Sequence, residues 1–210
     1  MPWEAEPARR AGTVHLADSL DELTMYSAQL ACGVVPAKPL IVVGQMTTTD
    51  PTRSPPGTET LWAYAHVPQT VRGDAGGSIT GAWTSAEVEV FADRIQARIE
   101  AKAPGFGERI RARHVMGPPR MQELNPSLVH GALNVGTAQL YQQLVFRPTP
   151  GLGRPTTPVR NVYLASGSAH PGGGVHGAPG ANAATLAIRH DARRRWTNPA
   201  RSRPAVARLP

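Results

Sequence analysis

Residues 161–190 constrain the fold more than any other part of this sequence. They begin with an apolar run at 162–165, which is typical of a short buried strand. A glycine-rich loop follows at 166–180, and small apolar residues at 181–188 then predict a helix. In such a unit the first N–H groups of the helix lack backbone partners, and the helix dipole favours negative charge there. The stretch therefore predicts a binding site for a phosphate or an electron-rich ring.

The glycines of this loop also match the spacing G-x-G-x-x-G at Gly172, Gly174 and Gly177, which alone is a weak sign of dinucleotide binding. A complete fingerprint needs a tight turn from strand to helix and a second strand that ends in an acidic residue about 20 residues later. Here Pro171 interrupts the loop, and an arginine-rich tail follows the helix. We therefore do not expect a complete nucleotide-binding βαβ unit at this position.

A long ordered set of positions in the stretch matches a known motif: Tyr163, Leu164, the run SAHPGGGV at 168–175, Gly180 and the run NAA at 182–184. In this order they resemble the C-terminal flavin-contacting motif of phytoene-desaturase-like FAD oxidoreductases. The resemblance implies FAD as the cofactor, with the His-Pro-Gly segment beside the isoalloxazine ring. It also implies that the N-terminus of the helix points at the pyrimidine side of the ring. A helix N-terminus there would stabilise the negative charge of reduced flavin.

The resemblance further implies which residues lie beside the flavin, most of them through backbone atoms: Pro171, Gly172, Gly173, Gly174, Val175, Gly180, Asn182 and Ala183. His170 is the implied side chain for ring contact or proton handling, and its alternative role is a hydrogen bond that closes its own loop. His176 lies in the same loop, but the pair lacks a third ligand, so no metal site is predicted. No serine–histidine–acid set or carboxylate pair can be argued from spacing, which leaves a hydrolase without support.

Earlier segments follow the order of the phytoene-dehydrogenase-related subgroup as well: Asp50-Pro51, PPG at 55–57, APGF at 103–106 and Arg147-Pro148. The resemblance covers residues 3–190 and implies an α+β or α/β fold. A mixed, largely antiparallel substrate-domain sheet with helices is expected over 1–150, and the closing strand, loop and helix of the FAD domain over 151–190. Family members begin with a nucleotide-binding βαβ unit, which this sequence does not show. We therefore expect the C-terminal portion of a two-domain FAD oxidoreductase, colourless when purified alone.

Two helices are predicted by capping boxes, in which Ser or Thr is followed three residues later by Glu. Ser19 begins the first helix, over 20–31, and Thr84 begins the second, over 84–103. On the second helix we expect Arg94, Arg98 and Glu100 on a solvated face rather than in a site, because charged side chains are seldom buried. The single cysteine, Cys32, excludes a disulfide within the chain and is expected to be a small core residue.

A hairpin is predicted by two apolar runs, at 40–44 and 61–67, which a long polar loop connects. In the second run Trp62, Tyr64 and His66 alternate with smaller residues, so their side chains share one face. These three side chains are candidates for lining a substrate cavity, and the alternative is an ordinary packed face of the hairpin.

The net charge of +7 belongs almost entirely to the C-terminal end, because seven arginines and one acidic residue lie at or beyond position 189. The nearly neutral remainder argues against a specific nucleic-acid partner. Residues 191–210 are basic, contain prolines and few apolar side chains, and are expected to be disordered. The sequence has no apolar run long enough for a transmembrane segment and no signal peptide, which favours a cytoplasmic protein.

Two functions remain open from the sequence. The first is an FAD-dependent oxidoreductase that transfers hydride from an apolar small molecule to flavin. The second is a non-catalytic remnant or interaction module that does not bind FAD alone. Such a module would form a homo-oligomer or associate with the N-terminal half that the resemblance implies.

Overall fold

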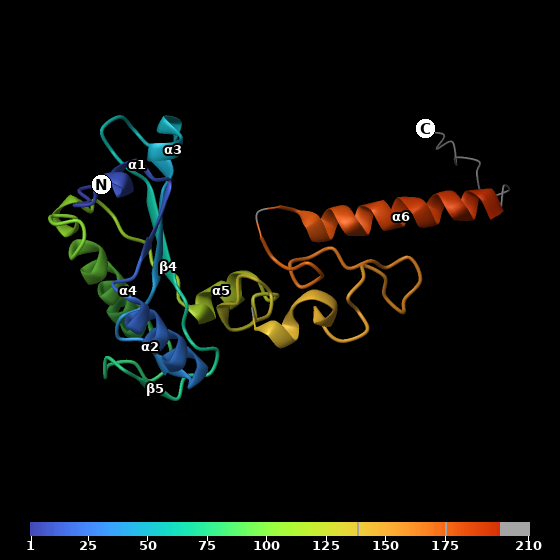
Figure 1. The fold of residues 1–210 in the computed structure, drawn as a ribbon, viewed down its shortest axis with the longest axis horizontal. Helices are drawn as coiled ribbons and strands as arrows, with labels where there is room; N and C mark the ends of the chain where they lie inside the picture. Colours follow the sequence, from blue (N-terminus) through green and yellow to red (C-terminus); the bar gives the residue numbers. More distant parts are fainter. Residues whose placement is uncertain (138, 175, 198–210) are drawn as a thin grey trace, which may run out of the picture. The chain divides into compact units, whose positions relative to one another are not determined.

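A computed structural model describes residues 1–137, 139–174 and 176–197 of the chain. The chain divides into two units, Met1–Met121 and Gln122–Pro210 (Figure 1). In order, the first contains α1 (Glu6–Arg10), β1 (Thr13–Leu16), α2 (Leu20–Ala31), β2 (Val34–Val35), β3 (Ile41–Gln45), α3 (Met46–Thr49), the 3₁₀ helix η1 (Pro51–Arg53), β4 (Leu61–Ala65), β5 (Gly73–Asp74), α4 (Ser85–Glu100) and η2 (Gly107–Arg109). Helix α5 (Pro118–Leu124) follows, and then η3 (Val129–Gly131), η4 (Leu140–Gln142), η5 (Leu144–Phe146) and α6 (Ala178–Thr197).

The first unit is built on a three-stranded antiparallel sheet in the order β1-β3-β4. The central strand β3 is buried along its whole length, as its continuous apolar run predicts. Ile41 pairs with Ala65 and Gln45 pairs with Leu61, which confirms the predicted hairpin. Strands β2 and β5 form a separate short parallel pair. The unit is therefore a mixed, largely antiparallel α+β structure.

The core of this unit is centred on Trp3, whose side chain is 1% exposed. Its indole Nε1 donates to Oε1 of the buried Gln45 at 2.8 Å, and Gln45 Nε2 donates to the carbonyls of Ala8 and Ala11. A buried indole N–H needs such a partner. Apolar residues of the sheet and of α4 surround the indole, among them Ile41, Val43 and Ile99. The N-terminal segment is thus fastened to the end of the central strand.

Both predicted helix caps are confirmed. Ser19 Oγ accepts a hydrogen bond from the N–H of Glu22 at 3.1 Å, and Thr84 Oγ1 accepts one from the N–H of Glu87 at 3.3 Å. The expectation that Cys32 lies in the core is wrong, because it caps the C-terminus of α2 and is exposed. The capping boxes therefore predict correctly where the two helices begin, but they do not predict which residues at the helix ends are buried.

The expectation of a solvated face on α4 is also wrong. Arg94 forms a bidentate ion pair with Asp74: Nη1 lies 2.6 Å from Oδ1, and Nη2 lies 2.5 Å from Oδ2. The Asp74 side chain is 3% exposed. Asp74 also accepts hydrogen bonds from three backbone N–H groups of its own turn. Burial alone would raise the pKa of Asp74, but Arg94 and these three donors outweigh it and hold that pKa well below its usual range. Arg98 also forms an ion pair, through a single contact with Glu22 of α2.

The second unit departs from the predicted strand, loop and helix. Residues 162–165 form no strand, since Tyr163 makes an isolated bridge to Thr156 and Val162 is 48% exposed. Helix α6 begins earlier than predicted and continues to Thr197, so residues 191–197 are helical rather than disordered. An ion pair between Arg195 and Asp191, one turn apart, supports this extension. The rest of the expected disordered tail lies outside the described residues.

None of the helices in the described part of the chain is long and apolar enough to cross a membrane.

Candidate functional site

The glycine loop of the second unit is anchored by Arg147, whose side chain is almost completely buried. Its guanidinium donates hydrogen bonds to the carbonyl oxygens of Asn134, Thr137 and Gly167, at distances of 2.5 to 3.1 Å. All of its recorded partners are backbone carbonyls, and a guanidinium has enough donors to hold several at once. Arg147 thus joins the segment before η4 to the start of the glycine loop.

Two of the predicted flavin-contacting glycines are needed for packing inside the loop. Gly172 has φ +115°, and a Cβ there would lie 3.2 Å from Arg147 Nε. A Cβ on Gly173 would lie 2.8 Å from Asn134 Oδ1 and 3.4 Å from Asn134 Cα. At Gly172 the positive φ and the buried guanidinium both disfavour a larger residue, and at Gly173 a larger residue would crowd Asn134. Close packing is therefore one sufficient reason for glycine at both positions.

The outer edge of the loop is nevertheless bare. Pro171, Gly173 and Gly174 are exposed, and the nearest atoms to a Cβ on Gly174 would be those of the exposed His176 ring, at 2.7 Å. His170 lies beside this edge, and its Nδ1 is 3.1 Å from the carbonyl oxygen of Leu144. The bond that His170 makes therefore joins it to a different segment instead of closing its own loop. Val175, which is also expected at the flavin, lies outside the described residues.

The N-terminus of α6 is placed differently from the expectation. The helix begins at Ala178, so Gly180 lies in its first turn, whereas Asn182 and Ala183 lie one turn further on. Ala178 donates its N–H to Nδ1 of His176 at 3.0 Å, and the next residue is proline, which has no N–H. Within the described residues, Gly180 is then the first-turn N–H without an acceptor. The position of Asn182 and Ala183 at the helix end is thus corrected, and their contact with a cofactor stays a prediction.

Trp62, Tyr64 and His66 share one face of the hairpin, as predicted. The Trp62 and Tyr64 rings stack with centroids 5.6 Å apart, and Tyr64 meets His66 edge-on at 5.8 Å. Gly44 on β3 permits this arrangement, because the Trp62 ring occupies the space that a Cβ would fill. The three side chains are exposed, so they form an aromatic surface, and their role in a substrate cavity stays a prediction.

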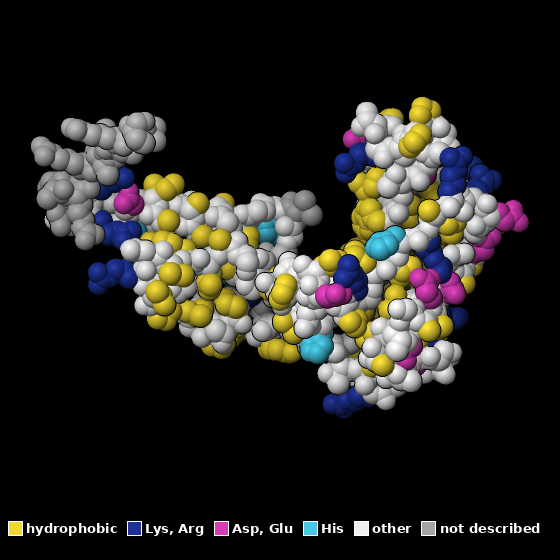
Figure 2. Space-filling view, turned by 180° about the vertical axis from the view of Figure 1, so that it is seen from behind, with side chains coloured by type: hydrophobic (Ala, Val, Ile, Leu, Met, Phe, Trp, Pro, Cys, Tyr) yellow, Lys and Arg dark blue, Asp and Glu magenta, His cyan; other side chains and the backbone are white. Residues whose placement is uncertain are grey.

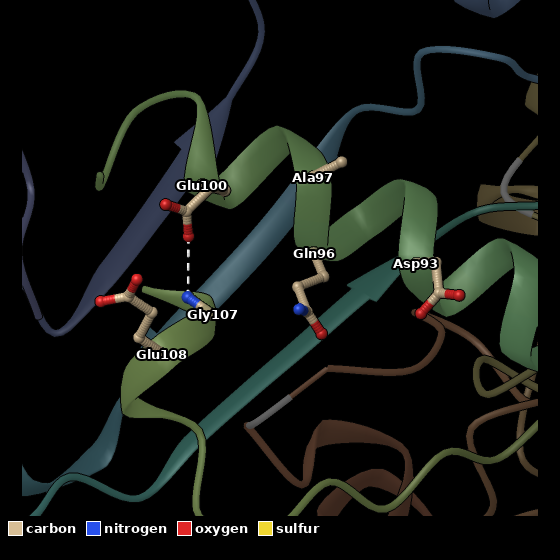
Figure 3. A pocket seen from close by; sticks show the side chains of 6 residues that line it. All are labelled: Asp93, Gln96, Ala97, Glu100, Gly107 and Glu108. Atoms are coloured by element: carbon tan, nitrogen blue, oxygen red, sulfur yellow. Dashed lines mark hydrogen bonds between the residues drawn. The ribbon is translucent and has the colours of Figure 1, made fainter. Parts of the chain in front are cut away.

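A cavity of about 390 Å³ lies beside α4, and Figure 3 shows the residues that line it: Asp93, Gln96, Ala97, Glu100, Gly107 and Glu108. The Glu100 carboxylate accepts hydrogen bonds from the N–H groups of Gly107 and Gly105, at 2.7 and 2.6 Å, which lowers its pKa. Asp93 accepts one from Arg113 at 2.7 Å. Glu100 thus holds the turn that follows α4, and Asp93 holds Arg113 against the middle of the helix. Nowhere in the described chain do three or more metal-ligating side chains converge on one point.

Comparison with known proteins identifies relatives of this chain, although no family model matches it. It is 35% identical over 196 residues to pyridine nucleotide-disulfide oxidoreductase domain-containing protein 2 of Mus musculus, and 31% identical over 196 residues to that of Rattus norvegicus. These alignments cover 90% of this chain and 32% of each relative, so the chain spans about a third of their length. A phytoene desaturase (lycopene-forming) of Paracoccus is 32% identical over 143 residues, which are 67% of this chain and 26% of that protein. The chain is therefore an FAD-oxidoreductase-related protein, similar to pyridine nucleotide-disulfide oxidoreductase domain-containing protein 2.

Proposed function

We propose that this chain forms the C-terminal portion of an FAD-dependent, phytoene-dehydrogenase-like oxidoreductase that removes hydride from an apolar small molecule. The observation that carries the proposal is the bare edge of the glycine loop at Gly173 and Gly174, in a chain whose alignment with oxidoreductase relatives covers 90% of its length. A backbone without side chains lets a flat ring approach closely. Bound FAD would supply the hydride acceptor, N5 of the flavin ring.

The residues of the loop fit one wall of a flavin site. Gly173 and Gly174 offer a flat backbone surface, and the Gly180 N–H is a donor for a ring carbonyl that gains negative charge on reduction. His170 provides an imidazole beside the same edge and is held there by the Leu144 carbonyl. The buried Arg147 keeps this wall rigid, because it fastens Gly167 to the chain around Asn134. The work of the chain is therefore to position the ring and stabilise its charge.

Gly174 offers a sharper test of this wall than Gly173. A side chain at position 173 would approach the backbone of Asn134, which Arg147 holds in place, whereas a side chain at position 174 meets only the flexible, exposed ring of His176. The test uses a hybrid in which residues 1–190 replace the matching third of the mouse relative. The probe variant combines Gly174→Val with His176→Ala, and His176→Ala alone is its matched control.

The probe variant should lose flavin affinity about tenfold or more while its unfolding midpoint stays close to that of the control. Gly105→Ala is the opposite control, since Gly105 has φ +77° in the turn after α4. It should cost about 1 kcal/mol of stability and leave flavin content unchanged. FAD titration and thermal unfolding of the four proteins decide the matter. Full flavin binding by the probe variant would show that the loop is not the cofactor wall.

One observation favours the second candidate function, an interaction module without catalysis. Large apolar side chains are exposed along residues 128–146, among them Val129, Leu133, Leu140, Tyr141 and Leu144. So many exposed large apolar side chains in one segment are typical of a region that contacts another protein. If this candidate is right, the 210-residue chain will associate with itself in sedimentation velocity, and the hybrid will bind no FAD. FAD binding by the hybrid would exclude the candidate.

A further inference from the structure

The second unit contains a cavity of about 440 Å³ that the proposed flavin wall does not include. Two segments line it, the chain around the Tyr163 bridge and one face of α6, through Thr156, Thr157, Val159, Arg160, Asn161, Val162, Tyr163, His190, Arg193 and Arg194. Arginine is the most frequent residue in this lining, and none of the lining residues is acidic. The cavity therefore concentrates positive charge within a single unit.

Two of the three arginines, Arg160 and Arg193, have guanidinium groups without a hydrogen-bond or ion-pair partner among the described residues. The third, Arg194, is oriented by two contacts: its Nε donates to the His190 carbonyl at 3.2 Å, and its Nη1 contacts Asn161 Oδ1. Asp191 does not neutralise the cavity, because its carboxylate pairs with Arg195 at 2.8 Å. Two guanidinium groups are thus free to bind an anion, beside a third that is already held in place.

The rest of the cavity lining combines polar side chains with two valines and two rings, and a contact between the rings joins its two segments. The Tyr163 hydroxyl lies 2.9 Å from Nδ1 of His190, and their ring centroids are 5.7 Å apart, which joins the bridge segment to α6. Val159 and Val162 also line the cavity, and both remain exposed to solvent. A ligand here would therefore meet guanidinium groups together with aromatic rings and methyl groups.

We propose that this cavity binds a phosphate ester with a small apolar or aromatic body. Guanidinium forks match the oxygens of a phosphate group, and a doubly charged group can satisfy two of them at once. A monocarboxylate would compensate one charge, and an uncharged ligand would compensate none. Figure 2 shows Lys and Arg side chains gathered near the end of the second unit that carries α6. This proposal is independent of the flavin wall.

The test is isothermal titration calorimetry of the 210-residue chain with phenyl phosphate, inorganic phosphate and phenol. Phenyl phosphate should bind most tightly, inorganic phosphate more weakly, and phenol not detectably. Arg160→Gln and Arg193→Gln should each weaken phenyl phosphate binding about tenfold, because each removes one charge-assisted contact. Arg189→Gln is the matched control: it removes the same charge from the same helix as Arg193→Gln, at an exposed position outside the cavity lining, and should change affinity less than about twofold.

Circular dichroism of each variant establishes that the helices remain folded. If Arg189→Gln weakens phenyl phosphate binding as much as Arg160→Gln and Arg193→Gln do, the proposal is overturned. Binding would then depend on the overall positive charge of the chain instead of on the cavity. Failure of the unaltered chain to bind phenyl phosphate would overturn it too. So would binding of duplex DNA that phenyl phosphate does not compete away, since the arginines would then serve a nucleic acid.

Discussion

Met1–Met121 buries the large apolar side chains at its centre, whereas Gln122–Pro210 leaves most of its described ones exposed. In the first unit Trp3, Ile41 and Ile99 are nearly inaccessible and belong to one cluster of apolar side chains from the N-terminal segment, the sheet and α4. In the second unit the buried apolar side chains are small, such as Ala169 and Ala183, and Leu140 is 89% exposed. Among the described residues of that unit, the most deeply buried large side chain is that of Arg147, which is 3% exposed.

This difference indicates two sources of stability. The first unit gains free energy from the burial of apolar area around a packed centre. The second depends on charge-assisted hydrogen bonds from one guanidinium to a set of carbonyl groups, and these bonds are strong because water is excluded from them. Its apolar side chains are then free to contact another protein surface. The predictions below test this comparison from the largest expected effect to the smallest.

Trp3→Ala should produce the largest loss, about 3–5 kcal/mol of the stability of the first unit. The substitution leaves a cavity in the core and also removes the partner of Gln45 Oε1. Urea unfolding followed by circular dichroism measures the loss, and hydrogen exchange assigns it to a unit. Exchange within α6 should stay unchanged, and faster exchange there would show that the two units share one core.

Arg147→Gln should be the most damaging change in the second unit, with a loss of roughly 3 kcal/mol. A glutamine amide cannot reach or satisfy the carbonyl oxygens of Asn134, Thr137 and Gly167 together. Hydrogen exchange should rise in the glycine loop while β3 keeps its protection. Arg154→Gln is the control, since it removes a charge from an exposed side chain of the same unit that has no hydrogen bond or ion pair with the described residues, and it should have little effect. A loss no larger than that of the control would contradict the role of Arg147 as the anchor.

Acid should weaken the first unit through Asp74. Its pKa is depressed in the folded chain, so its contribution is fully present above the ordinary carboxyl pKa of about 3.9 and is lost as pH falls below that value. The loss of stability from protonation of Asp74 should be smaller than the losses in Trp3→Ala and Arg147→Gln, because other carboxylates begin to titrate before Asp74 is fully protonated. The measurement is the free energy of unfolding in urea at about pH 5 and about pH 3, which lie on either side of that carboxyl pKa. Asp74→Asn should flatten the dependence on pH, and an unchanged slope in this variant would contradict the assignment.

The sequence predicted the parts of the first unit that depend on neighbouring residues. The caps at Ser19 and Thr84 and the hairpin of β3 and β4 follow from short patterns, and the structure confirms them. It did not predict that Trp3 is the centre of the core or that Arg94 pairs with Asp74. Both contacts join residues far apart in the chain, and no local pattern signals them.

In the second unit, local patterns were a poorer guide. The apolar run at 162–165 resembles a buried strand, but a strand also needs a partner along its length, and Tyr163 finds one isolated bridge. The glycine loop was singled out correctly as an unusual segment, whereas the packing of Gly172 against Arg147 was not foreseen. An arginine before a proline gives no sign that it will be buried among carbonyl groups. The high glycine content identifies such a loop in the sequence, but the reason for each glycine is seen only in the tertiary contacts.

The smallest expected effect compares one leucine in each unit. Leu140→Ala should change stability by less than about 0.5 kcal/mol, because the side chain is already exposed. Leu16→Ala, the same substitution at a position that is 8% exposed in the core of the first unit, should cost about 2–5 kcal/mol. Urea unfolding of both variants tests the pair, and sedimentation velocity adds a second measurement. If the apolar surface of the second unit mediates association, Leu140→Ala will weaken self-association although it leaves stability unchanged. A stability loss at Leu140 comparable to that at Leu16 would show that the second unit has a packed apolar centre of its own.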